Sequence, residues 1–63
     1  MIFKEGSRHK LSFIIQGREL FFDATIIAVE GDIISFRDKY GDVLNFNLRN
    51  LGSSKELNGE EDD

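Results

Sequence analysis

Apolar and polar residues alternate through much of the first fifty positions of the chain, with the period of two that is typical of β-strands. Three stretches show this pattern, residues 11–16, 32–38 and 43–48, and they are rich in Ile, Leu, Phe and Val. Ser12 and Ile14 fall at outward positions. The inward positions are held by Leu11, Phe13, Ile15, Ile34, Phe36, Leu44, Phe46 and Leu48.

The longest stretch without glycine or proline, residues 20–29, is apolar on both of its alternating faces. Phe22 and Ile26 lie on one face, and Phe21 and Ile27 lie on the other. Two arrangements explain such a strand. Either it bends through a β-bulge and exchanges its faces, as strands of small barrels do, or a partner covers its second face.

Glycines separate these strands at positions that suit tight turns. Gly17 supplies the positive φ of a hairpin turn, and Glu30-Gly31 forms a second two-residue turn. Residues 38–42 fit a type I turn closed by Gly41 in the left-handed region. Asn50 tolerates the left-handed conformation, so we expect the last strand to end there.

Four or five short strands joined by tight turns predict an all-β fold, and the pattern is typical of a small barrel. We predict a five-stranded barrel over residues 1–52. Four strands come from the stretches above, and residues 1–4 could form the fifth. Residues 1–52 contain seven basic and seven acidic residues, whereas residues 53–63 contain one and five. The latter composition predicts a disordered acidic tail, the alternative being one short strand at residues 55–57.

The size of the chain predicts self-association. A domain of 63 residues hides only about 60% of its unfolded surface, so its core is small. The sequence has no cysteine and one histidine, which leaves oligomerisation as the expected additional source of stability. It has no apolar run of the roughly 18–20 residues that a membrane span needs and no signal-peptide pattern, so we expect a cytoplasmic protein without a membrane partner.

Two segments resemble a known family. Phe13–Leu20 (FIIQGREL), followed by Ala24–Asp32 (ATIIAVEGD), has an apolar strand, a glycine turn and a strand that ends in apolar and acidic residues. Leu44–Leu51 (LNFNLRNL) contains Leu48-Arg49-Asn50, which is similar to an Ile-Arg-Gly step. Both segments resemble the Sm-like small barrels, which include the bacterial host-factor RNA chaperone. The resemblance implies an Sm-like or Src-homology-like barrel, RNA binding, and a ring held together by the fourth and fifth strands.

The chain also departs from the pattern of that family. Phe21-Phe22 stand where the family usually has a glycine in its bent second strand. Glu30-Gly31-Asp32 does not clearly supply the Asp/Asn pair that holds a uridine, and the chaperone's Tyr-Lys-His signature is absent. No clear fifth strand follows Asn50. Because small barrels host many unrelated functions, the function must be argued from the site residues.

Basic and aromatic side chains provide candidate contacts to nucleic acid, since Lys and Arg meet phosphates and aromatic rings stack on bases. One basic cluster lies at Lys4, Arg8, His9 and Lys10, and Tyr40 occupies the tip of the last hairpin. The alternative is that these bases balance nearby acids and that Tyr40 packs on its own hairpin. We predict binding of RNA or single-stranded DNA through Arg8, Lys10, Arg37, Lys39, Tyr40, Asn47 and Arg49.

Apolar residues at outward positions provide a second candidate surface. A homo-oligomer or a protein partner would dock on Ile14, Phe21, Ile27 and Ile33, which makes a regulatory or inhibitory interaction module the alternative function. Curvature of the sheet could instead bury these residues. The acidic tail either solubilises the chain or competes with nucleic acid for the basic cluster.

The sequence contains no pattern that indicates catalysis. It has no cysteine nucleophile, and His9 has no evident serine and carboxylate partners. Asp32 and Asp42 could approach one another around a cation, but carboxylates at turns more often form the turn. Each glycine of the predicted turns is solitary, so no phosphate-binding loop is present. We therefore expect a binding protein without cofactor, metal or enzymatic activity.

Overall fold

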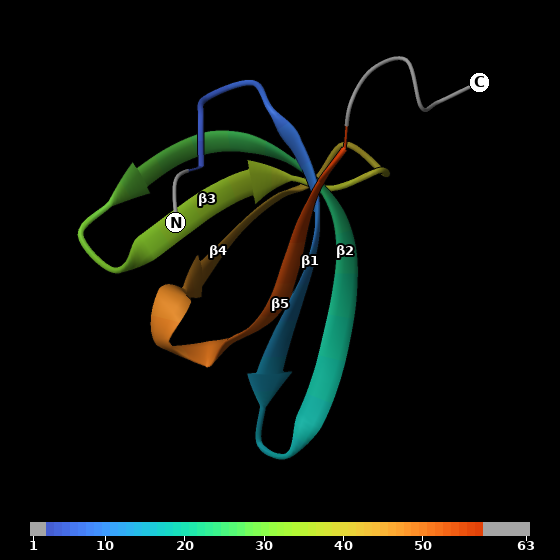
Figure 1. Ribbon diagram of the computed structural model, residues 1–63, viewed down its shortest axis with the longest axis vertical. Coiled ribbons are helices and arrows are strands. Elements are labelled where there is room, and N and C mark those ends of the chain that lie inside the picture. The colour runs from blue at the N-terminus through green and yellow to red at the C-terminus, as the bar shows by residue number, and fades with distance from the viewer. Residues whose placement is uncertain (1–2, 58–63) are drawn as a thin grey trace.

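The computed structural model describes residues 3–57, which form five strands and one short 3₁₀ helix (Figure 1). Met1, Ile2 and residues 58–63, which include most of the predicted acidic tail, lie outside the described residues. The elements are β1 (Arg8–Ile15), β2 (Arg18–Glu30), β3 (Ile33–Arg37), β4 (Val43–Asn47), η1 (Leu48–Asn50) and β5 (Leu51–Leu57). The prediction of an all-β fold is confirmed. No helix within residues 3–57 is long and apolar enough to cross a membrane.

All five strands belong to one antiparallel sheet with the order β4-β3-β2-β1-β5. Within the described residues the sheet is not closed, because no hydrogen-bonded ladder joins its two edge strands, β4 and β5. The fifth strand is β5, which follows Asn50 directly. Phe3 and Lys4 do not belong to a strand, and the rest of the segment 1–4 lies outside the described residues. Residues 53–57, which the sequence assigned to a disordered tail, pair with β1 instead.

The long strand β2 bends, and its two halves pair with different strands. Its residues 18–25 pair with β1, and its residues 25–30 pair with β3. Between these halves the register with β3 shifts, so that Ile26 faces Phe36 while Ala28 faces Ser35 and Ile27 is the extra residue. Figure 1 shows β2 rising beside β1 and then curving over toward β3. Of the two arrangements that the two apolar faces left open, the structure shows the β-bulge.

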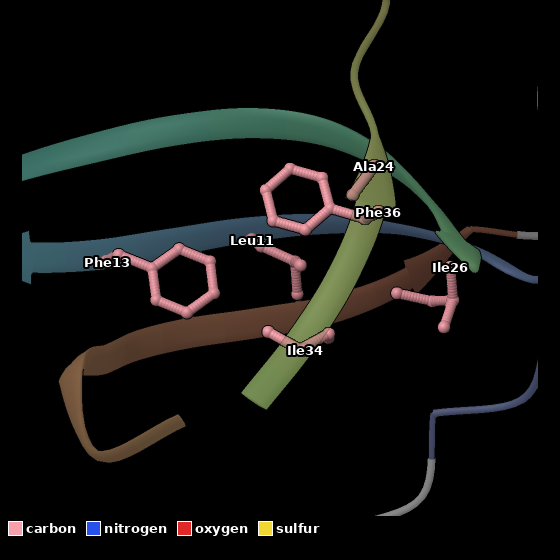
Figure 2. Packing of buried hydrophobic residues seen from close by; sticks show 6 residues of the cluster. All are labelled: Leu11, Phe13, Ala24, Ile26, Ile34 and Phe36. Carbon is pink, nitrogen blue, oxygen red and sulfur yellow. The ribbon is translucent and has the colours of Figure 1, made fainter. Parts of the chain in front are cut away.

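The core lies where β1, β2 and β3 cross. Leu11, Phe13, Ala24, Ile26, Ile34 and Phe36 are buried, and Figure 2 shows their side chains pointing toward one another from the three strands. The rings of Phe13 and Phe46 stack with centroids 4.5 Å apart, and Phe36 and Phe22 complete the aromatic cluster. The other predicted inward residues, Ile15, Leu44 and Leu48, are partly buried against this core, as expected.

The turns follow the predicted glycines. Gln16 and Gly17 both have positive φ, at 52° and 77°, which is the combination that a two-residue type I′ hairpin turn requires. Gly41 is left-handed at the β3–β4 turn, as predicted, with φ of 89°. The strand ends close to Arg49-Asn50, as predicted, since β4 stops at Asn47, but the left-handed conformation expected at Asn50 is not observed. Asn50 instead ends the 3₁₀ helix η1, which Asn47 caps by accepting the backbone N–H of Arg49 at 2.9 Å.

The segment before β1 is held to β2 and the core. The backbone of Gly6 donates to Ile26, and Ile26 donates to Ser7, so this segment extends the β1–β2 ladder. The Ser7 hydroxyl donates to the Lys4 carbonyl and therefore accepts from Nε2 of His9 at 2.9 Å. His9 is buried, and the ring of Phe3 lies edge-on to it at 5.0 Å between centroids. His9 is thus a core residue and not part of a basic surface.

Ser12 of β1 lies against β5 at the irregularity of the β1–β5 ladder, where it meets Ser53 and faces Gly52. Ser12 was expected to face outward, but it is fully buried, because β1 has a neighbouring strand on each side and Glu19 and Ser53 close over it. Its hydroxyl donates to Oε2 of Glu19 at 2.7 Å and meets the hydroxyl of Ser53 at 2.9 Å. A Cβ at Gly52 would lie 2.8 Å from Oγ of Ser12, so only glycine fits at this irregularity of the β1–β5 ladder.

We expect Gly52→Ala to destabilise the fold by about 1–3 kcal/mol, as overpacking of a filled site does. The reason is the clash with Oγ of Ser12, which its two hydrogen bonds hold in place. Urea unfolding of the single variants and the double variant with Ser12→Ala measures the coupling. Removing Oγ should reduce the cost of Gly52→Ala. Equal costs in both backgrounds would contradict the proposed clash.

Candidate nucleic-acid interface

A groove of about 660 Å³ lies between the sheet and the β3–β4 turn. β1, β2 and β5 form its floor, and the turn at residues 38–42 contributes one wall. Its lining residues are Lys10, Leu11, Phe21, Phe22, Asp23, Asp38, Lys39, Tyr40, Ser53, Ser54 and Lys55. The groove thus combines residues from four segments that are distant in the sequence.

Strand register aligns charged side chains across the floor of the groove. Lys10 on β1 lies opposite Asp23 on β2 and opposite Lys55 on β5. Nζ of Lys10 is 3.2 Å from Oδ1 of Asp23, but both side chains are solvated, so this ion pair adds little stability. Two lysines directly opposite one another repel, which costs free energy in a sheet. An anion that bound between them would remove that cost.

Two exposed aromatic rings border the lysines. Phe21 lies opposite Ser12, two register positions from the Lys10–Asp23 pair, and is 72% exposed, while Tyr40 at the tip of the turn is 79% exposed. Nζ of Lys39 lies over the Tyr40 ring, 5.4 Å from its centroid. Exposed apolar groups that gather beside polar ones commonly mark an interaction site. The two rings offer faces on which flat, apolar groups can stack.

The turn that carries Tyr40 is rigidly built. Oδ1 of Asp38 accepts the backbone N–H groups of Tyr40 and Asp42, both at 2.9 Å. Nη1 of Arg37 donates to the carbonyl of Gly41 at 3.1 Å. These bonds fix the backbone of the turn before any ligand arrives, which lowers the entropy lost on binding. They also hold the carboxylate of Asp38 against the backbone of its own turn.

The ionisable side chains that line the groove have a small excess of positive charge. It contains three lysines and two aspartates, and of these aspartates Asp23 pairs with Lys10 while Asp38 accepts amides of its own turn. Lys39 and Lys55 form no ion pair with a carboxylate among residues 3–57. Within that part of the chain, no three His, Cys, Asp or Glu side chains are grouped closely enough to hold a metal ion.

The predicted nucleic-acid residues separate into three groups. Lys10, Lys39 and Tyr40 line the groove together. Arg37 braces the turn behind them, and Arg8 lies two residues from Lys10 in β1 but does not line the groove. Asn47 and Arg49 lie at η1, at the other end of β4 from the turn that carries Tyr40. The structure therefore does not unite Asn47 and Arg49 with the other candidates.

The predicted apolar surface is likewise not one patch. Ile14 and Phe21 are exposed on the same face of the β1–β2 hairpin, and Ile33 is exposed at the start of β3. Ile27 is half-buried because it is the extra residue of the bulge. Phe21 belongs to the groove, so the residue expected to dock a protein stands beside the lysines expected to bind phosphate.

Sequence reasoning missed Lys55 and Ser53, which belong to β5. The segment from Gly52 to Glu56 has no apolar residue, so it carries no strand pattern of its own. The one available signal was Leu57, which follows Leu51 at a spacing of six, so that the two leucines bound a segment of strand length.

Comparisons of the chain with protein-family models, with curated proteins and with solved structures find no match.

Proposed function

We propose that this protein binds single-stranded nucleic acid, RNA or DNA, in the groove between the sheet and the β3–β4 turn. One observation carries the proposal: three lysines and two exposed aromatic rings converge there from β1, β2, the turn and β5. Lysines that follow a phosphate backbone, with rings on which bases stack, are the usual components of single-strand binding sites. Binding without catalysis is the whole of the proposed activity.

The groove favours a single strand over a duplex. Phe21 and Tyr40 present their rings to solvent, and only unpaired bases expose faces for such rings to stack on. Stacking tolerates any base, and the lysines contact phosphates irrespective of sequence, so we expect little sequence specificity. The serine hydroxyls and the backbone of β5 at the floor can accept or donate one or two hydrogen bonds to the strand.

The proposal extends to an Sm-like barrel that self-associates in the cytoplasm. The order β4-β3-β2-β1-β5 and the bent β2 support it, since they bring the sheet part of the way around its core. β4 and β5 are the two edge strands of the sheet, and β4 of one copy could pair with β5 of the next. Such a contact is heterologous, and it produces a ring where the rotation closes. Light scattering tests this contact, because a ring requires a solution mass that is a multiple of the mass of one chain.

Fluorescence anisotropy with labelled U12 and dT12 oligonucleotides tests the binding function. With three lysines on phosphates, the logarithm of affinity should fall with the logarithm of salt concentration with a slope of about −2. Tyr40→Ala should weaken binding by roughly 5- to 100-fold, because one stacked base is lost. Tyr40→Phe, which retains the ring, is the matched control. Absence of binding at low salt would refute the function.

Docking of a protein partner is the second candidate, and the exposure of Phe21 beside Ile14 favours it. An apolar interface would depend on Phe21 and respond weakly to salt, whereas the nucleic-acid site depends on both Phe21 and the lysines. Phe21→Asp therefore distinguishes the candidates when it is compared with lysine variants. Loss of self-association on Phe21→Asp, with the chain still folded and no oligonucleotide bound, would favour the protein interface.

A further inference from the structure

We propose that the groove prefers guanine at one position, where the base stacks on Phe21 while Asp23 and Lys10 contact its hydrogen-bonding edge. The inference deepens the proposed function and rests on it. Stacking and phosphate contacts do not distinguish the bases, so this position is the exception along an otherwise unspecific strand. Three observations carry it: the placement of Phe21 beside Asp23, the ion pair of Asp23 with Lys10, and the exposure of these side chains.

The first observation is the placement of Phe21 and Asp23 on one face of β2. They are two residues apart in this strand, so their side chains point to the same side of the sheet, roughly 7 Å apart along the strand. Both line the groove. Glu19, the neighbour of Phe21 on that face in the other direction, does not line the groove, and its Oε2 accepts the hydroxyl of Ser12. A base stacked on Phe21 in the groove therefore has its edge beside Asp23.

The second observation is the ion pair between Asp23 and Lys10, which the β1–β2 register places opposite one another. Nζ of Lys10 lies 3.2 Å from Oδ1 of Asp23. An ionised carboxylate has about four acceptor positions on its two oxygens, and an ammonium has three N–H donors, so one contact uses only part of this capacity. The pair thus offers two acceptors and a neighbouring donor to a ligand in the groove.

The hydrogen-bonding edge of guanine is complementary to this pair. Its Watson–Crick edge has two adjacent donors, N1–H and the N2 amino group, next to the acceptor O6. The two donors match the oxygens of Asp23 in a charge-assisted, bidentate contact, and O6 matches the ammonium of Lys10. The same edge of uracil, thymine, cytosine or adenine places an acceptor opposite one carboxylate oxygen. That oxygen would lose its hydrogen bond to water without gaining another, which disfavours these bases.

The third observation is that the three side chains are open to a ligand. Phe21 is exposed, and the side chains of Lys10 and Asp23 have relative exposures of 64% and 38%. Because the ion pair is solvated and adds little stability, it can rearrange around a base at small cost. Lys10 then contacts the base, while Lys39 and Lys55 of the groove remain for the phosphates.

Fluorescence anisotropy with four labelled 12-mers tests the preference. They are dT12 and three strands in which one central thymine is replaced by guanine, inosine or adenine. We expect the guanine strand to bind about tenfold more tightly than dT12, the effect of one bidentate contact. The adenine strand controls for purine stacking, and inosine, which lacks the N2 amino group, should lose most of the gain. Equal affinities for the guanine and adenine strands would overturn the inference.

Asp23→Asn tests the assignment to this residue, since an amide of the same size has only one acceptor atom and cannot receive both donors of guanine. The guanine strand should then bind no more tightly than the adenine strand. Loss of a negative charge strengthens the binding of every strand, so the ratio of the two affinities is the readout. Glu56→Gln removes the same charge from an exposed residue of β5 that does not line the groove, and it should preserve the ratio. A preference for guanine that survived Asp23→Asn would exclude the role of Asp23.

The four strands also separate this inference from the proposed function. If dT12 binds and the guanine strand binds with equal affinity, single-strand binding stands and the preference for guanine fails. If none of the four strands binds at low salt, both fail.

Discussion

Phe13→Ala is expected to destabilise the fold by about 3–5 kcal/mol, the cost of truncating a buried aromatic side chain. Phe13 is fully buried, and its ring stacks on Phe46 at 4.5 Å and on Phe36 at 6.1 Å between centroids. Rings from β3 and β4 therefore lose their common neighbour on β1. A domain of this size has roughly 3–9 kcal/mol of stability in total, so much of the variant should be unfolded.

Urea unfolding followed by circular dichroism measures this loss. Phe21→Ala is the matched control, since it removes the same ring from the neighbouring strand at a position that is 72% exposed. We expect the control to change the free energy of unfolding by less than about 0.5 kcal/mol. If the two alanine variants were equally stable, Phe13 would not be at the centre of the core.

The second large effect is expected on binding. Lys39→Glu combined with Lys55→Glu should lower the affinity for dT12 by about 100-fold, since two charge-assisted contacts of about 1.5 kcal/mol each are lost. Repulsion of the phosphates by the new carboxylates adds to the loss. Both side chains are exposed and form no ion pair with a carboxylate of residues 3–57, so the fold should retain its stability.

Lys4→Glu combined with Arg49→Glu is the control for this variant. It changes the net charge by the same amount at two exposed positions that do not line the groove. Binding to the groove predicts a small loss of affinity in the control and a large one in the groove variant. Equal losses in both would indicate that the whole surface attracts the oligonucleotide without a defined site.

Four strands could be predicted from alternation and turn chemistry, because these are local properties of the sequence. Residues 20–29 are apolar on both faces, which made a bulge one of two possible arrangements, and the structure shows the bulge. β5 could not be predicted in the same way. Its central residues are Gly, Ser, Lys and Glu, and they adopt a strand because β1 offers an unpaired edge to them. Tertiary context overrides β-propensity at such a position.

Only part of the candidate site could be predicted, because local patterns show which side chains a turn exposes but not which strands pair. Tyr40 and Lys39 could be found because a turn tip exposes its side chains. Ser12 was assigned outward by alternation, but alternation does not reveal that Glu19 and Ser53 close over it. Lys55 joined the groove only through the pairing of β5 with β1. Asn47 was expected to contact bases, whereas its side chain caps η1.

The pairing of β1 with β5 also sets the order in which the chain can fold. Each of the other three strand pairs joins neighbours in sequence across a tight turn, so these hairpins can form on the microsecond timescale. The β1–β5 ladder joins residues 8–13 to residues 51–57 and must close a loop that contains the rest of the sheet. Contacts of such long sequence separation slow folding. During synthesis on the ribosome, β1 therefore waits with one edge open until β5 has emerged.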